Sequence, residues 1–218
     1  GQKPADSIEF DWHDAKNFSI EGLGFKDVKS PYDRLPGRAE GVVRQAVWDL
    51  SRHSAGVLVR FTTNSPTLKA RWVRTKEDLA GVNMTAISAS GLDLYTKTGP
   101  GKWRWLGFGR PEKTIKSESV LANGVPKGER EYMLYLPLFN GVTSLEIGVP
   151  KGTAISPGAA RPADRKPILF YGTSITHGAS ASRSGMTHVA ILGRQFDRPV
   201  INLGFSGNGK MEPEVTKF

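Results

Sequence analysis

A serine that follows a short apolar run is the first candidate for chemistry in this chain of 218 residues. Residues 167–171 are apolar or aromatic and lead into Gly172-Thr173-Ser174. Such a run, bounded by turn residues, predicts a strand buried on both faces of a parallel sheet. Ligands bind beyond the carboxyl ends of these strands. Ser174 would therefore face a substrate, and a helix beginning there would aim free backbone N–H groups at a developing negative charge.

A second glycine-rich turn repeats the arrangement. Residues 199–203 are mainly apolar, contain Asn202, and run into Gly204-Phe205-Ser206-Gly207. Successive strand–helix units place their turns at the same edge of one sheet. We therefore expect Ser174 and the second turn to lie close together.

Two other interpretations compete with a nucleophilic serine. Thr173 or Ser174 could only cap the helix that follows. Residues 204–211 also approach the phosphate-binding pattern Gly-x-x-x-x-Gly-Lys-Ser/Thr. Met211 stands at its last position, however, and a thioether cannot replace the hydroxyl that holds magnesium. Nucleotide binding is the weaker interpretation, and we predict no cofactor.

A serine hydroxyl needs a base, because it is a poor nucleophile on its own. His177 lies three residues after Ser174 and would share its side of a helix. His188 is expected on a helix surface. His13 and His53 have no partner at metal-ligand spacing, so no metal site is predicted.

The first two thirds of the chain must position these turns. Short apolar or alternating segments separated by Gly and Pro predict an antiparallel β-sandwich. The expected strands are 57–61, 68–73, 84–89, 92–95, 103–106, 132–136 and 144–149.

The predicted domains are a sandwich over 1–151, a Pro- and Ala-rich linker over 152–166, and an α/β portion over 167–218. Within the α/β portion a stripe at helical spacing predicts a helix that Ser184 could cap. Its members are Met186, Val189, Leu192 and Phe196. A further helix is expected after Lys210, with Pro213 in its first turn.

The tryptophans allow two interpretations. Trp103 and Trp105 would share one strand face, where they could stack on a sugar ring. Core packing is the competing interpretation, and it is also the expectation for Trp12, Trp48 and Trp72.

The composition is 38% hydrophobic and 23% charged, which is ordinary for a globular protein. No apolar run is long enough for a membrane span. The net charge of +9 comes without a basic run or nucleic-acid motif, so we predict a solubilising surface and no nucleic-acid partner. The absence of cysteine excludes disulfides and thiolate metal sites.

The two turns together resemble the SGNH hydrolases, also called GDSL-like lipases and esterases. That family carries its nucleophilic serine in a Gly-Asp-Ser-like turn, which here reads Gly172-Thr173-Ser174. Its second block resembles the segment from Asn202 to Gly207. The resemblance assigns the nucleophile to Ser174 and an oxyanion N–H to Gly207.

The first region resembles a β-sandwich that precedes the hydrolase domain in one subgroup of this family. Gly91-Leu92-Asp93-Leu94-Tyr95 matches its Gly-x-Asp-Leu-Tyr motif, and residues 32–36 and 47–51 are also similar to that subgroup. The implied fold is a jelly-roll sandwich, similar to carbohydrate-binding modules, followed by a flavodoxin-like parallel α/β domain.

The resemblance implies a serine esterase that hydrolyses an acyl ester, and an acylated carbohydrate is the expected substrate. The family's Asp-x-x-His pair and a further oxyanion Asn are expected beyond Phe218, so we expect a longer protein. The alternative is a non-catalytic sandwich that binds glycan or packs against a catalytic domain. No signal peptide is recognisable at Gly1; we expect a secreted or periplasmic protein whose signal has been removed. The sequence does not indicate an oligomeric state.

Overall fold

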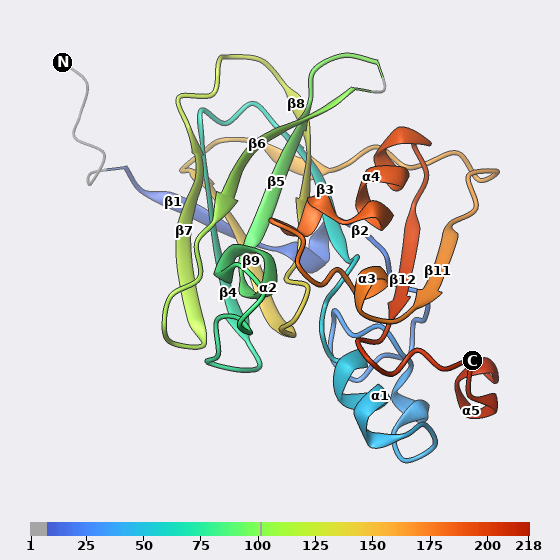
Figure 1. Ribbon diagram of the computed structural model, residues 1–218. Coiled ribbons are helices and arrows are strands. Elements are labelled where there is room, and N and C mark those ends of the chain that lie inside the picture. Colours follow the sequence, from blue (N-terminus) through green and yellow to red (C-terminus); the bar gives the residue numbers. More distant parts are fainter. Residues whose placement is uncertain (1–7, 101) are drawn as a thin grey trace.

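The computed structural model describes residues 8–100 and 102–218 (Figure 1). Residues 1–4, on which the expectation of export rests, lie outside this range. Two antiparallel sheets form the first part of the chain. One sheet has the order β1 (Phe10–Asp14), β9 (Val142–Pro150), β4 (Thr67–Arg74), β7 (Lys116–Asn123). The other has the order β10 (Ile155–Pro157), β3 (Leu58–Thr63), β8 (Arg130–Tyr135), β5 (Leu92–Lys97), β6 (Trp103–Gly109), with β2 (Ser19–Glu21) also on β3.

The alternating pattern of β4 explains how the two sheets pack. Leu68, Ala70 and Trp72 are buried, whereas Lys69 and Arg71 point outward. The buried residues of both sheets form one continuous apolar core. The predicted antiparallel sandwich is therefore confirmed.

A third sheet consists of two parallel strands, β11 (Ile168–Gly172) and β12 (Val200–Gly204). Three short helices connect them: α3 (Ser174–His177), the 3₁₀ helix η4 (Ser184–Met186) and α4 (His188–Gln195). In the register Gly172 pairs with Gly204, so both strands end at the same level. Both glycine-rich turns therefore leave the sheet at one edge, as predicted.

The remaining helices lie in the connections. They are η2 (Ala15–Asn17), η3 (Gly37–Ala39), α1 (Gln45–Ser51), α2 (Ala86–Ser90) and α5 (Pro213–Thr216). Pro213 opens α5, as predicted. Within the part of the chain that the structure describes, no helix has the length and apolar character needed to cross a membrane.

Two local predictions are wrong. Residues 84–89 were expected to form a strand, but the Thr85 hydroxyl accepts a hydrogen bond from the Ser88 N–H and opens α2 instead. Ser184 does not cap the long helix. That position belongs to Thr187, whose hydroxyl accepts from the Ala190 N–H at 3.1 Å.

The segment predicted as a linker contains β10, which pairs with β3 of the sandwich.

The apolar stripe of α4 is narrower than expected. Val189 and Ala190 are buried, while Met186 and Phe196 are exposed.

A second apolar cluster joins the two parts of the chain. It contains Leu35, Val47 and Trp48 from the region of α1, together with Leu203 and Phe205 from β12 and the turn after it. Figure 1 shows α1 below the carboxyl end of β12. The sandwich side and the parallel strands thus share a buried interface.

This interface predicts a large effect of truncating Phe205, whose side chain is fully buried. Phe205→Ala should lower the free energy of unfolding by about 3–5 kcal/mol, because it leaves a cavity between the two parts. Phe196→Ala, at a 56% exposed position, should stay within about 0.5 kcal/mol. Urea unfolding measures both. Equal, small effects would contradict the described packing.

Candidate active site

Ser174 is the first residue of α3, directly after β11. Neither Thr173 nor Ser174 acts as the proposed side-chain cap, since α3 has no capping hydrogen bond from Thr173. The Ser174 side chain is partly exposed, and within the described residues its hydroxyl has no hydrogen-bond partner. The hydroxyl is therefore available to a substrate.

The turn after β12 contains Gly207, the predicted oxyanion donor. Gly207 has φ +69°, a left-handed conformation that favours glycine. The Ser206 N–H lies 3.3 Å from His177 Nδ1, and the Asn208 N–H donates to the Phe205 carbonyl at 2.7 Å. Within residues 8–100 and 102–218 the Gly207 N–H meets no protein acceptor, and neither does that of Ser174. These two N–H groups remain free to bind an oxyanion.

Close packing of α3 against β12 brings the two turns together. A Cβ at Gly204 would collide with the backbone nitrogen of His177, so only glycine allows this approach. Ser174 and Ser206 then line one pocket of about 420 Å³. The sandwich side contributes the opposite wall through Asn83, Met84 and Phe139.

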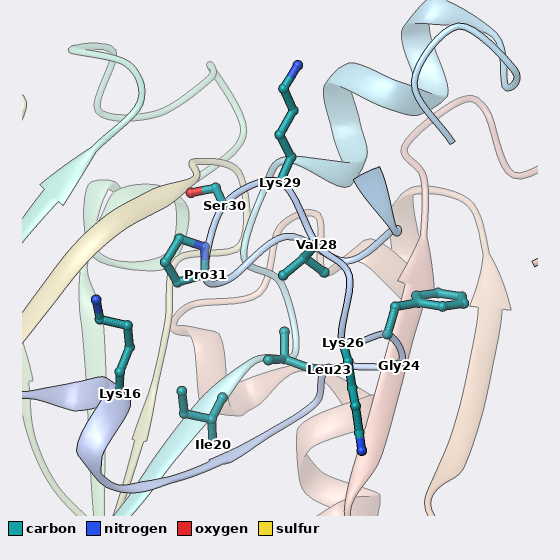
Figure 2. Close-up of a pocket in the computed structure, with 10 residues that line it drawn as sticks. Lys16, Ile20, Leu23, Gly24, Lys26, Val28, Lys29, Ser30 and Pro31 are labelled. Carbon is teal, nitrogen blue, oxygen red and sulfur yellow. The ribbon is translucent and has the colours of Figure 1, made fainter. Parts of the chain in front are cut away.

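Another pocket, of about 640 Å³, lies on the sandwich side (Figure 2). Figure 2 shows Leu23 and Val28 in its lining, while Lys26 and Lys29 extend away from it. No histidine or carboxylate is among its described lining residues. The smaller pocket also lacks both among its described lining residues, but Ser174 lines it, so we place the candidate chemistry there.

His177 is a structural group and not the base for Ser174. Its ring is fully buried and stacks on Phe139, with centroids 4.1 Å apart. Nε2 lies 2.7 Å from the Leu138 carbonyl, and Nδ1 faces the Ser206 N–H. A neutral imidazole satisfies both contacts, donating through Nε2 and accepting at Nδ1. Burial, with Arg34 nearby, holds the pKa of His177 well below its usual value.

The Asn202 side chain forms hydrogen bonds to both α3 and β12. Its side-chain NH₂ donates to the Thr176 carbonyl and its oxygen accepts from the Gly204 N–H, both at 2.8 Å. The side chain is fully buried and does not line the pocket. Asn202 thus ties β12 to α3.

Two family models match this chain. Residues 10–155 match the model described as GxDLY, the N-terminus of the SGNH-hydrolase-type esterases. Residues 165–218 match the GDSL-like lipase/acylhydrolase family. A solved structure from Bacteroides ovatus, provisionally described as a GDSL-like lipase, is 37% identical and superimposes with a TM-score of 0.89 over 96% of the chain.

The chain belongs to the GDSL-like esterases that carry a GxDLY N-terminal domain.

Two more distant structures share the fold of this GDSL-like chain. A salicylyl acyltransferase from a tetracycline biosynthetic pathway is 18% identical, with a TM-score of 0.72 over 95% of the chain. A family two carbohydrate esterase from Cellvibrio japonicus is 12% identical, with a TM-score of 0.55 over 94%. The chain covers 60%, 58% and 57% of the three solved chains, respectively. Among curated proteins, none matches this sequence.

The GxDLY motif of this GDSL-like chain lies at the interface between its two parts. Asp93 is fully buried and accepts from the Gly185 N–H and from Trp105 Nε1, each at 2.9 Å. Its oxygen also lies 3.3 Å from Arg183 Nε. Burial nevertheless raises the pKa of Asp93. In the sequence alone the motif indicates only the family, because nothing local reveals a partner about 90 residues away.

The tryptophans divide between core and surface. Trp72 is buried in the sandwich core and Trp48 in the second apolar cluster, while Trp12 is only partly buried. Trp103 and Trp105 pair with Lys97 and Tyr95 on one sheet face, as predicted. Neither lies between the two sheets. Trp103 packs near α4, and Trp105 remains 46% exposed beneath the Arg183 guanidinium.

The phosphate-loop interpretation is not supported by the turn after β12. Its N–H groups at Ser206, Asn208 and Lys210 are bonded within the protein. The Arg44 guanidinium is bonded to the Asn208 side chain and to Glu212. His188 is exposed at the start of α4, as expected. Among the described residues, no three metal-binding side chains come together.

Removing the Asp93 carboxylate should be costly. Asp93→Ala leaves the half-buried Arg183 and two N–H donors without their acceptor, which predicts a loss of about 3–5 kcal/mol in unfolding free energy. Glu9→Ala removes a 73% exposed partner of Lys151 and should cost no more than about 1 kcal/mol. Chemical denaturation at pH 7 compares them. A loss in Asp93→Ala as small as that of its control would mean that the motif does not hold the interface.

The buried His53 predicts acid sensitivity. Burial, together with Lys76 and Arg34, lowers the pKa of His53 to about 3. Below pH 6.5 this histidine therefore takes up a proton in the unfolded chain but not in the folded chain. The free energy of unfolding consequently decreases as the pH is lowered. Between pH 7 and pH 5 we expect the free energy of unfolding to decrease by about 2 kcal/mol less in His53→Gln than in the wild type.

The exposed His188→Gln variant is the matched control and should keep the wild-type slope. Asp33, whose pKa burial raises to about 6, changes stability in the opposite direction as pH falls. Asp33 is present in the wild type and in both variants, so its contribution to the pH dependence cancels in the comparison. Identical pH slopes for wild type and His53→Gln would show that His53 is not buried as described.

Proposed function

We propose that this chain forms the front part of a serine esterase whose nucleophile is Ser174. One observation carries the proposal: an unpartnered serine hydroxyl shares a pocket with a turn whose Gly207 N–H is unpaired within the described residues. This combination of nucleophile and preorganised donors is what acyl transfer needs.

In the proposed reaction, Ser174 Oγ attacks the ester carbonyl while a base removes its proton. The N–H groups of Gly207 and Ser174 bind the resulting oxyanion, each worth about 3–4 kcal/mol in such sites. Collapse of the intermediate expels the alcohol and leaves an acyl-serine. Water then attacks the acyl-serine, releasing the acid and restoring Ser174.

The base is proposed to lie beyond Phe218. His177 is excluded by its two contacts, His188 lies exposed at the start of α4, and His13 lies on β1 of the sandwich. His53 faces Lys76, with its Nε2 3.0 Å from Lys76 Nζ. The family resemblance places an Asp-x-x-His pair and an oxyanion Asn in the region that follows. The described chain would then supply the nucleophile and two donors only.

For the substrate, we propose an acyl ester of a carbohydrate. The shared fold with the Cellvibrio japonicus carbohydrate esterase supports this class, and the small pocket suits a short acyl group. The apolar wall formed by Met84, Phe139 and Ile175 would contact that acyl group.

The alternative, a free glycan-binding sandwich, has less support. Asp93 of the sandwich is buried against residues 183–185, and Arg194 stacks over Tyr95 at 4.1 Å. These contacts favour a sandwich that packs on the catalytic part.

A fluorophosphonate probe tests the proposal in a protein that extends beyond Phe218. We expect labelling at Ser174, complete loss of labelling in Ser174→Ala, and retention in Ser206→Ala. Ser206 is the matched control because it lines the same pocket. Labelling that persists in Ser174→Ala would overturn the assignment of the nucleophile.

A further inference from the structure

Arg34 is a buried arginine without a carboxylate partner of its own. Its side chain is 1% exposed, and the neighbouring Asp33 instead pairs with Arg52 at 2.7 Å. All four of its hydrogen bonds within the described residues go to main-chain carbonyls, those of His53, Leu50, Asn202 and Gly204. A buried cation is costly unless such groups satisfy it, so this arrangement demands an explanation.

The four carbonyls belong to two different parts of the chain. Nε and Nη2 donate to His53 and Leu50, at 2.8 and 2.6 Å, on the sandwich side at the end of α1. Nη1 donates to Asn202 and Gly204, at 3.1 and 2.7 Å, at the end of β12. Arg34 therefore bridges the sandwich side to the last residues of β12.

The end of β12 leads directly into the turn that carries the Gly207 N–H. Phe205, the first residue of the turn, lies under the Arg34 guanidinium at 5.1 Å. The Phe205 N–H donates to the Gly172 carbonyl at 2.9 Å, and Gly172 pairs with Gly204. Whatever fixes Gly204 thus also fixes the strand end from which Ser174 emerges.

Only a guanidinium can make these contacts together. Its planar fork presents several N–H donors at fixed angles, whereas a lysine ammonium is a single point on a flexible stem. The donors here point to both sides of the interface at once. The positive charge also lies close enough to His177 to help lower its pKa.

We propose that Arg34 is a positioning residue for the oxyanion turn: it holds the end of β12 so that the Gly207 N–H faces the Ser174 pocket. It lies outside the residues that line the pocket, so it would act through the backbone and not on the substrate. This inference rests on the proposed function for its catalytic consequence, but not for its structural one.

Hydrogen exchange tests the structural part in the 218-residue chain itself. In Arg34→Met we expect the amides of 204–209 to exchange at least about tenfold faster, because the strand end loses its bridge. Arg74→Met is the matched control. Arg74 is also 1% exposed and donates only to main-chain carbonyls, those of residues 76–78, 112 and 114, none of which lies on β12 or the turn after it. Its loss should leave exchange over 204–209 unchanged.

Kinetics in the longer, active protein test the catalytic part. Arg34→Lys and Arg34→Met should lower kcat about 10²-fold with KM changed less than about threefold, as expected when an oxyanion donor is misplaced. Arg74→Met should keep the wild-type kcat at a temperature where it is folded. If Arg34→Met does not fold, Arg34→Lys decides both measurements.

The outcomes separate this inference from the proposed function. Equal exchange over 204–209 in the Arg34 and Arg74 variants, or a kcat loss shared by both, would overturn the role of Arg34. A different result would be that the wild-type protein is not labelled at Ser174, while exchange over 204–209 is faster in Arg34→Met and not in Arg74→Met. The proposed function would then be wrong, and the structural role of Arg34 would be supported.

Discussion

The contact on which the site depends is the one between the sandwich side and the carboxyl end of β12. Two parallel strands with a few short helices bury little apolar surface on their own. Their ends are instead fixed from outside, by the apolar cluster around Phe205 and by the four carbonyl contacts of Arg34. The two glycine-rich turns are thus held in place by residues that lie earlier in the sequence.

His177 and Asp93, two buried polar residues at this interface, have hydrogen-bond partners. His177 uses both ring nitrogens, and Asp93 accepts from a backbone N–H and an indole. Such matching avoids the large cost of an unpaired buried group. It also decides which N–H groups remain free, because His177 occupies the Ser206 N–H while that of Gly207 has no acceptor in the described part. The interface and the proposed oxyanion donors therefore belong to one hydrogen-bond network.

Sequence patterns predicted the features that depend on local periodicity. The alternation in 68–73 identified β4, and the apolar runs before Gly172 and Gly204 identified the two parallel strands. Residues 84–89 failed because a threonine cap outweighed a weakly apolar segment. The roles of Arg34 and Asp93 could not be predicted, since their partners across the interface lie about 90 to 170 residues away and follow from tertiary packing alone.

The central claim is that Ser174 and the N–H groups of Gly207 and Ser174 form one acyl-transfer site. A crystal structure of the longer protein after reaction with a phosphonate tests it most directly. We predict phosphorus on Ser174 Oγ, with the phosphoryl oxygen about 2.7–3.1 Å from both nitrogens. Phosphorus on another residue, or a phosphoryl oxygen pointing away from Gly207, would contradict the account.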